Sequence, residues 1–404
     1  MNNAFLLFLI NPFIGMIQAF KYYRFPWAKN SLWLFVIFYG FTMFRPEAMD
    51  SSRYVARLEV LYDAPLSWDT FIANFYSAEG NSIDIYQPLV TWVLALFTKN
   101  PNVLFAVFGI VFGYFYSRNI WLLFEVAGNR RFEKSLWILI FAFASVIGFW
   151  ELNGVRMWTA AHIFFYGAFI FIIKGERKGM MIAAASILVH FSFVLPVAIL
   201  VAYTMVKLPW KILYLVFIAS FFVSELNIGS VGTFLGGIAP EFLVPRINSY
   251  TSDDYVESVS NAEAATNWYV TYYLKSLGWV IFIMISFIYF SNLARIKSNR
   301  AFSHFFGFAI LFLSIGNLMS MIPSGGRYLT IARLFALALL FLFYVWYDSL
   351  SYRKFLVTLS PLLLFFIIVS IRISFETTTF VTILANPIIA LFIDVPIPLI
   401  AFFK

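Results

Sequence analysis

Long apolar stretches separated by short polar and basic segments run through the whole chain. A helix that crosses the hydrocarbon core of a bilayer needs about 20 predominantly apolar residues. The windows that fit are 4–20, 31–48, 101–123, 135–151, 154–173, 179–205, 211–229, 268–290, 301–322, 327–347, 355–373 and 380–402. The pattern predicts an all-α, polytopic transmembrane protein with about 11 to 13 spans. Because no internal repeat or low-complexity segment interrupts it, we expect residues 1–404 to form a single integral membrane domain.

The composition supports a membrane protein and excludes several kinds of site. Of the 404 residues, 62% are hydrophobic and 12% are charged, and the mean hydropathy is +0.84. Soluble domains are about 25% charged. The chain has no cysteine, and His162, His190 and His304 lie far apart, so we expect no metal site and no cofactor. The net charge of +8 does not indicate nucleic-acid binding, because the basic residues lie in short connections between apolar runs.

Basic and acidic residues divide between the connections and predict an orientation. Lys and Arg mark the cytoplasmic side of short loops. The basic connections contain Lys21, Arg24 and Lys29; Arg130, Arg131 and Lys134; Lys174, Arg177 and Lys178; Arg295, Lys297 and Arg300; and Arg353 and Lys354. Two long segments, 45–98 and 230–267, are predominantly acidic instead. We expect both to be outer loops.

The run 87–98 in the first outer loop is too short to cross the bilayer, and Pro101 follows it closely. If it crossed, Arg130 and Arg131 would lie outside. We therefore expect an interfacial or re-entrant helix on the outer side.

The number of membrane crossings raises a second conflict. Lys178 is expected inside, and the acidic loop that begins at residue 230 is expected outside. Two full spans between them would give the wrong side, whereas one or three crossings would fit. Pro196 and the basic pair Lys207 and Lys211 favour a broken helix that enters and returns. Non-helical backbone at membrane depth is tolerated only where it is buried in protein or lines a wet cavity. The break therefore indicates a site near His190.

Several ionisable residues at the predicted outer ends of helices are candidates for function, because such groups are costly in a membrane. They are Asp50, Arg53, Glu151, Arg156, His190, Arg327 and Arg333. Simpler explanations stay open: Arg156 and Arg327 could be anchors at the interface, Glu151 could only pair with Arg156, and His190 could be a core histidine. Arg333, six positions after Arg327, could line the same cavity.

Arginines that converge on a buried cavity suit one class of ligand. The planar guanidinium pairs bidentately with the oxygens of a diphosphate or a carboxylate. An anion of this kind that also carries a long apolar tail is a polyprenyl diphosphate. Aromatic side chains near the outer rim, Trp158 among them, could stack on sugars or form an ordinary interfacial belt.

Five segments resemble the EpsG family of Wzy-type polysaccharide polymerases. They are Asp50-Ser51-Ser52-Arg53-Tyr54, Gln87-Pro88-Leu89, the helix start Asn153-Gly154-Val155-Arg156-Met157-Trp158-Thr159-Ala160, His190-Phe191-Ser192 and Arg327-Tyr328. Two positions depart from the family pattern: Gln87 replaces the usual Glu, and Met157 replaces the usual Gln.

The resemblance implies a glycosyltransferase that polymerises undecaprenyl-diphosphate-linked oligosaccharide repeat units, similar to the metal-independent C-type enzymes. It also implies a bacterial cytoplasmic membrane, an active site facing the periplasm or exterior, and a flippase and a chain-length regulator as partners. On this reading, the diphosphate is bound by Arg156, Arg327, Arg53 and Arg333, sugars contact Tyr54, Trp158 and Tyr328, and the candidate bases are His190, Asp50 and Glu151.

Three alternatives remain. A ligase of the O-antigen type would pass the same donor to a lipid core. A flippase or transporter of the lipid-linked glycan would be expected to show paired halves, which the sequence lacks. A sugar acyltransferase with a membrane histidine would be expected to keep its acyl donor on the cytoplasmic side.

Overall fold

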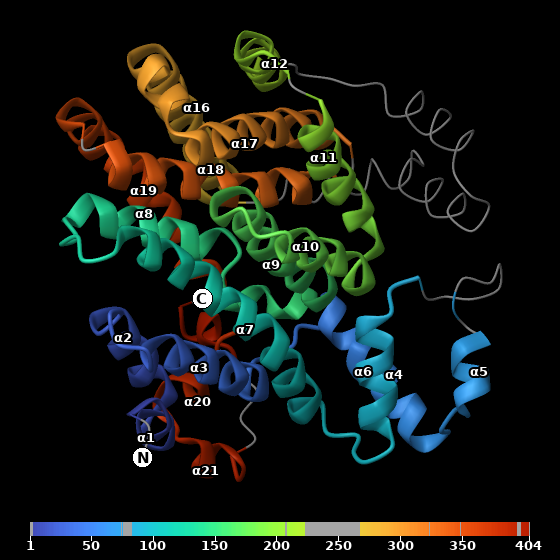
Figure 1. The fold of residues 1–404 in the computed structure, drawn as a ribbon. Helices are drawn as coiled ribbons and strands as arrows, with labels where there is room; N and C mark the ends of the chain where they lie inside the picture. Colours follow the sequence, from blue (N-terminus) through green and yellow to red (C-terminus); the bar gives the residue numbers. More distant parts are fainter. Residues whose placement is uncertain are drawn as a thin grey trace.

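The computed structural model describes residues 3–73, 75, 83–206, 208–222, 267–322, 324–347, 349–393 and 397–403. These residues are helical (Figure 1), with one isolated β-bridge between Thr379 and Pro398. Residues 230–266 of the predicted second outer loop, and Lys207, lie outside the described residues. The expectations for them stay predictions.

Within the described residues, six helical stretches are long and apolar enough to cross a membrane. They are α7 (Pro101–Ala127), the stretch Lys134–Lys174, α16 (Trp268–Ser298), α17 (Arg300–Met319), α18 (Gly326–Tyr347) and α19 (Leu350–Ser374). The second stretch turns at η1 (Phe149–Gly154), which separates α8 (Lys134–Val146) from α9 (Val155–Phe169) and the π-helical η2 (Ile170–Lys174). An all-α multi-pass membrane protein is thereby confirmed.

Three of the five basic connections meet at one end of the helix bundle. Arg24 donates to the carbonyl oxygens of Asn129 and Arg130, and Arg130 donates to that of Tyr344 at the end of α18. Arg353 pairs with Glu133 at 2.9 Å, just before α8. We call this the inner end, following the predicted orientation, and the opposite end the outer end.

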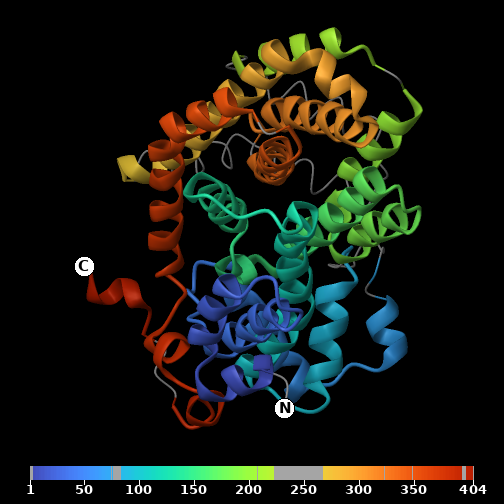
Figure 2. The same ribbon diagram turned by 60° about the vertical axis from the view of Figure 1, so that its left-hand side comes forward.

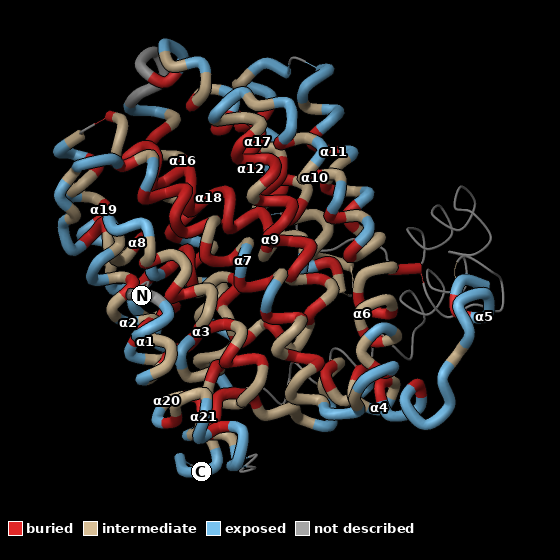
Figure 3. The backbone as a smooth tube through the Cα atoms, turned by 60° about the horizontal axis from the view of Figure 1, so that its bottom comes forward, coloured by how far each residue is buried: buried red, intermediate tan, exposed pale blue. Residues whose placement is uncertain are grey.

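Helix α18 lies at the centre of the packed core. Figure 2 shows it almost end-on, with neighbouring helices on several sides, and Figure 3 shows buried backbone along most of its length. Its Phe335 packs against aromatic rings of α9 and α17 at 4.9 to 6.0 Å between centroids; these rings belong to Phe164, Phe165, Phe305, Phe308 and Phe312. The burial is complete from residue 331 to 344, whereas Arg327 at the outer end of the helix is exposed.

Two predicted spans are wrong as continuous helices. The described residues of the window 380–402 form three short helices, α20 (Phe380–Leu384), α21 (Pro387–Ala390) and η5 (Leu399–Phe402). Thr379 and Asn386 cap the first two of these helices, and Pro387 starts α21 because it cannot continue a preceding helix. The window 4–20 divides at Asn11 into α1 (Asn3–Ile10) and α2 (Pro12–Lys21), for the same reason. The described helices therefore do not provide 11 to 13 full spans.

The first outer loop folds into short helices. Helix α3 (Ala28–Thr42) leads to α4 (Asp50–Asp63), α5 (Trp68–Ala73) and α6 (Tyr86–Ala95). Ten residues of helix rise about 15 Å, half of the hydrocarbon core, so α6 does not cross. Its Trp92 indole donates to the Leu66 carbonyl just after α4. The segment thus contains a short helix, and its place on the outer side of a membrane stays a prediction.

The segment after Lys178 reverses direction twice. Helix α10 (Lys178–Val189) ends at His190, and after the turn η3 (Phe191–Phe193) the chain continues as α11 (Val194–Met205) and α12 (Trp210–Phe222). The break lies at His190, whose backbone is extended, and Pro196 sits in the first turn of α11.

Contacts with α17 and α18 show in which direction α11 and α12 run. The Ser192 carbonyl accepts from Tyr328 at the outer start of α18, whereas Tyr203 donates to the His304 carbonyl at the inner start of α17. Helix α12 then returns, because Asn317 near the outer end of α17 donates to Ser220. The segment therefore forms three short helices that run in alternating directions, in line with the predicted broken helix.

Candidate functional site

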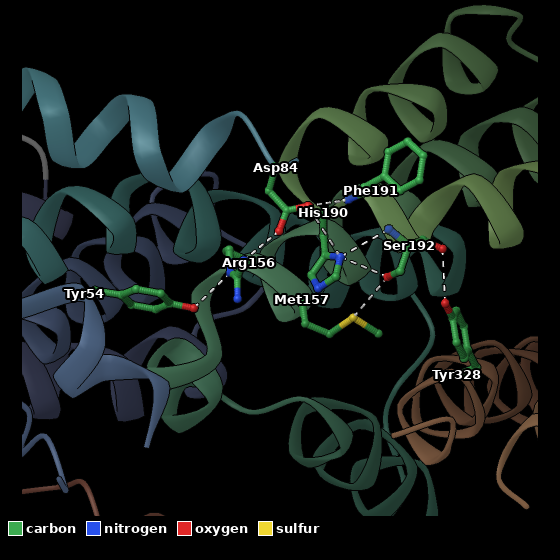
Figure 4. Close-up of polar contacts among 8 residues, drawn as sticks. All are labelled: Tyr54, Asp84, Arg156, Met157, His190, Phe191, Ser192 and Tyr328. Carbon is green, nitrogen blue, oxygen red and sulfur yellow. Dashed lines mark hydrogen bonds and ion pairs between the residues drawn. The ribbon is translucent and has the colours of Figure 1, made fainter. Parts of the chain in front are cut away.

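A buried carboxylate, Asp84, connects the first outer loop to the bundle (Figure 4). Its side chain is 3% exposed. Its Oδ2 accepts from Arg156 Nη1 at 2.9 Å, and its Oδ1 accepts from the backbone N–H of Phe191 at 2.7 Å. One carboxylate therefore joins the start of α9 to the break after α10.

Arg156 is held on two sides. Its Nε donates to the Tyr54 hydroxyl at 3.1 Å, in addition to the pair with Asp84. Burial raises the pKa of Tyr54, and the neighbouring guanidinium partly offsets this. Arg57 lies close to the Arg156 guanidinium. Burial lowers the pKa of Arg57, and the positive charge of Arg156 lowers it further. The expected clamp arginine is thus already paired with a carboxylate of the protein.

His190 caps the turn η3. Its Nδ1 accepts from the backbone N–H of Ser192 at 3.3 Å and lies 3.0 Å from Ser192 Oγ. The accepting role assigns the proton of a neutral ring to Nε2. Tyr328 donates to the Ser192 carbonyl at 3.2 Å. Residues from α9, η3 and α18 are thus linked through a few hydrogen bonds.

Next to this network lies a cavity of about 410 Å³, which we call the outer cavity. It is lined by Ala48, Met49, Asp50, Arg53, Trp150, Glu151, Asn153, Arg327, Ile373, Glu376 and Thr377. The network and the cavity use adjacent residues on α4 (Arg53 and Tyr54) and on α18 (Arg327 and Tyr328). The two features are therefore linked through neighbouring residues of the same two helices.

The charges of the outer cavity differ in how they are compensated. Asp50 pairs with Arg53 at 3.0 Å, and Glu376 pairs with Arg372 at 2.7 Å. Within the described part of the chain, Glu151 and Arg327 have no ion-pair partner within 4.0 Å, although Arg327 acts on Glu151 electrostatically through space. An unpaired carboxylate and an unpaired guanidinium thus face the same cavity.

The predicted site residues fall into four places. Arg156, His190, Tyr54 and Tyr328 belong to the Asp84 network; Asp50, Arg53, Glu151 and Arg327 line the outer cavity. Trp158 packs over Gly154, where an added Cβ would lie 2.9 Å from its ring. Arg333 lines a different cavity on another face of α18.

Asp84 is not predicted from the sequence as an individual site residue. It appears in the sequence as one of several acidic residues in an acidic loop. The only local sign of burial is that Asp84 follows the apolar Ile83 and precedes α6. A solvated carboxylate could occupy the same sequence position. Its partners lie 72 and 107 residues away.

Gln87 faces the interior of the outer helices. It is buried, and its side-chain amide donates to the Thr91 hydroxyl at 2.9 Å, one turn along α6. A neutral amide at this position needs no counter-charge, whereas a buried Glu would.

The described residues contain no group of three or more His, Asp or Glu placed to hold a metal ion. By helix length and hydropathy, the chain is a multi-pass membrane protein. Comparisons with family models, curated proteins and solved structures find no match.

Proposed function

We propose that the protein is a membrane glycosyltransferase that polymerises undecaprenyl-diphosphate-linked oligosaccharide repeat units. One observation carries the proposal. The segments on which the family resemblance rests are spread from Asp50 to Tyr328 along the chain, and four of the five meet at the Asp84 network and the outer cavity. Unrelated surface residues would have no reason to gather in this way.

The outer cavity offers charge for the leaving group. When the glycosidic bond to the lipid diphosphate breaks, negative charge develops on the diphosphate, and fixed cationic donors stabilise it without a metal. Arg327 suits this role because its guanidinium forms no ion pair within 4.0 Å with a carboxylate of the described residues, and Glu151 acts on it only through space. Arg156 is neutralised by Asp84, so we assign it to positioning the start of α9 and the break at His190.

Glu151 suits the role of general base. A base must have a lone pair within reach of the acceptor hydroxyl. Asp50 is tied to Arg53, and the Nδ1 lone pair of His190 is directed to Ser192. The unpaired carboxylate of Glu151 lines the cavity.

In the proposed reaction, the hydroxyl oxygen of the acceptor glycan attacks the anomeric carbon of the donor. The new C–O bond forms as the bond to the lipid diphosphate breaks. Glu151 takes the hydroxyl proton, and the polyprenyl diphosphate leaves with the bonding electron pair. Bonds and charges balance in this displacement without an oxidant or a reductant.

The test uses purified protein in lipid nanodiscs with defined lipid-linked repeat units, and the products are separated by length on a gel. We expect a ladder of products from the native chain. Glu151→Gln should lower the rate by about 10²–10⁴-fold, and Arg327→Ala by about 10²–10³-fold. Glu376→Gln is the matched control, since Glu376 lines the same cavity but is paired with Arg372; its rate should change only a few-fold.

Three outcomes would contradict the proposal. A full ladder from Glu151→Gln would remove the assigned base. Transfer of one unit to a lipid core without any ladder would favour the ligase alternative. Movement of the lipid-linked glycan across the bilayer without new glycosidic bonds would favour a flippase.

A further inference from the structure

A second cavity, of about 300 Å³, lies between α12, α16, α17 and α18. We call it the Arg333 pocket. It is lined by Phe217, Ser220, Phe221, Lys275, Gly278, Trp279, Ile281, Phe282, Leu313, Asn317, Ser320, Met321, Leu329 and Arg333. None of these residues lines the outer cavity or belongs to the Asp84 network. Figure 1 shows the four helices on the same side of the bundle, away from α4 and α6.

Arg333 is the unusual residue of this pocket. It is 9% exposed, and its Nε is buried without a hydrogen-bond partner. No ion pair joins it to a carboxylate in the described chain. An isolated cation inside a membrane protein is costly unless an anion or a set of dipoles compensates it. The arrangement therefore calls for an anionic partner that the described chain does not supply.

The remaining polar groups are suited to an anion as well. Lys275 adds a second positive charge at an exposed position, with its Nζ 5.4 Å from the Tyr272 ring centroid. Asn317 and Ser220 are joined by a hydrogen bond of 3.2 Å. Among the described residues that line it, none is Asp or Glu. Two cations with neutral donors and no competing carboxylate favour a phosphate or another compact anion.

The walls of the pocket are apolar and aromatic. Phe221 stacks on Phe282 with 4.4 Å between ring centroids, and Trp279 packs edge-on against both. Trp279 is 45% exposed and Phe222, next to Phe221, is 61% exposed. The apolar lining thus continues to the outside of the bundle, where a membrane protein meets lipid tails. A free phosphate would gain nothing from this wall, whereas an acyl or isoprenyl chain would be buried against it.

We propose that the Arg333 pocket binds the phosphate head of an anionic membrane lipid, with the lipid tail along α12 and α16. Arg333 lies about 9 Å further along α18 than Arg327 and on another face, so the pocket is separate from the outer cavity. A Cβ atom at Gly278 would lie 3.7 Å from Arg333 Nη2, so the absence of a side chain leaves room beside the guanidinium. This inference does not rest on the proposed transferase activity.

The experiment measures lipid binding to the purified full-length protein by native mass spectrometry in detergent. Three probes are titrated: dioleoylphosphatidylglycerol, dioleoylglycerol as the tail without a head, and inorganic phosphate as the head without a tail. We expect saturable binding of the first probe only. Arg333→Leu should weaken it at least tenfold, and Arg333→Lys should retain part of the affinity. Gly278→Leu, which fills the pocket without changing its charge, should weaken it as well.

Exposed lysines on the pocket helices provide a second test that does not depend on a buried substitution. Lys275→Gln should weaken binding several-fold, whereas Lys211→Gln on α12, outside the pocket lining, should not. Undiminished binding in both Arg333→Leu and Lys275→Gln would overturn the proposal. So would equal binding of dioleoylglycerol, saturable binding of phosphate alone, or loss of lipid in Arg327→Ala but not in Arg333→Leu.

Discussion

Replacing Asp84 with Asn tests whether one buried carboxylate holds the candidate site together. The substitution preserves the shape of the side chain but removes its charge. Its oxygen can still accept from the Phe191 N–H, while its amide group would face Arg156 Nη1 as a second donor. Arg156 would then lose its counter-charge.

The expected cost follows from the burial of the two partners. Removing one member of a fully buried ion pair costs about 3–5 kcal/mol. Asp84 is 3% exposed, but the Arg156 side chain is 31% exposed, so solvent screens part of the loss. We therefore expect the free energy of unfolding to fall by about 2–3 kcal/mol. Glu376→Gln, which breaks a pair whose members are 39% and 33% exposed, should cost only about 0–1 kcal/mol.

The assay is denaturant unfolding in mixed micelles for the native chain, Asp84→Asn, Arg156→Met and the double variant. If the two residues stabilise each other, the double variant should be less destabilised than the sum of the single variants, by more than about 1 kcal/mol. Equal losses for Asp84→Asn and Glu376→Gln, or additive losses in the cycle, would refute the reasoning.

Two further predictions concern the reversal of the chain after His190 and the close packing of α9 on α10. The chain has no cysteine, so a single cysteine at Met205, the exposed end of α11, should react with an impermeant thiol reagent in inverted vesicles but not in intact cells; a cysteine at Arg53 should show the opposite pattern. Labelling of both sites in intact cells would contradict the reversal after α10. Gly167→Ala should destabilise the protein by about 1–3 kcal/mol, because its Cβ would overlap the Ala183 backbone nitrogen and force α9 and α10 apart. Thermal unfolding checks this against Gly326→Ala, where an added Cβ meets nothing within 4 Å; similar losses would count against the close contact.

Much of the helical layout could be predicted because the requirement behind it is local. Backbone polar groups in lipid must be satisfied within the segment, so a long apolar run has to become a helix. The predicted window 327–347 corresponds to α18 (Gly326–Tyr347), and 301–322 to α17 (Arg300–Met319). Apolar composition alone did not distinguish residues 380–402 from a span. The capping residues and Pro387 that divide this segment lower its mean hydropathy only slightly.

The sequence by itself determined the class of protein, the interrupted helix after Lys178 and most of the residues that gather at the outer end. These follow from hydropathy, charge and motif order, which are properties of short stretches. Only the tertiary structure decided which charges remain unpaired. Asp84 neutralises Arg156 from 72 residues away, and the packing of α18 directs Arg327 and Arg333 into separate cavities. The physical reason is that the compensation of a buried charge depends on what lies within a few ångströms in space, and a linear sequence does not specify those neighbours.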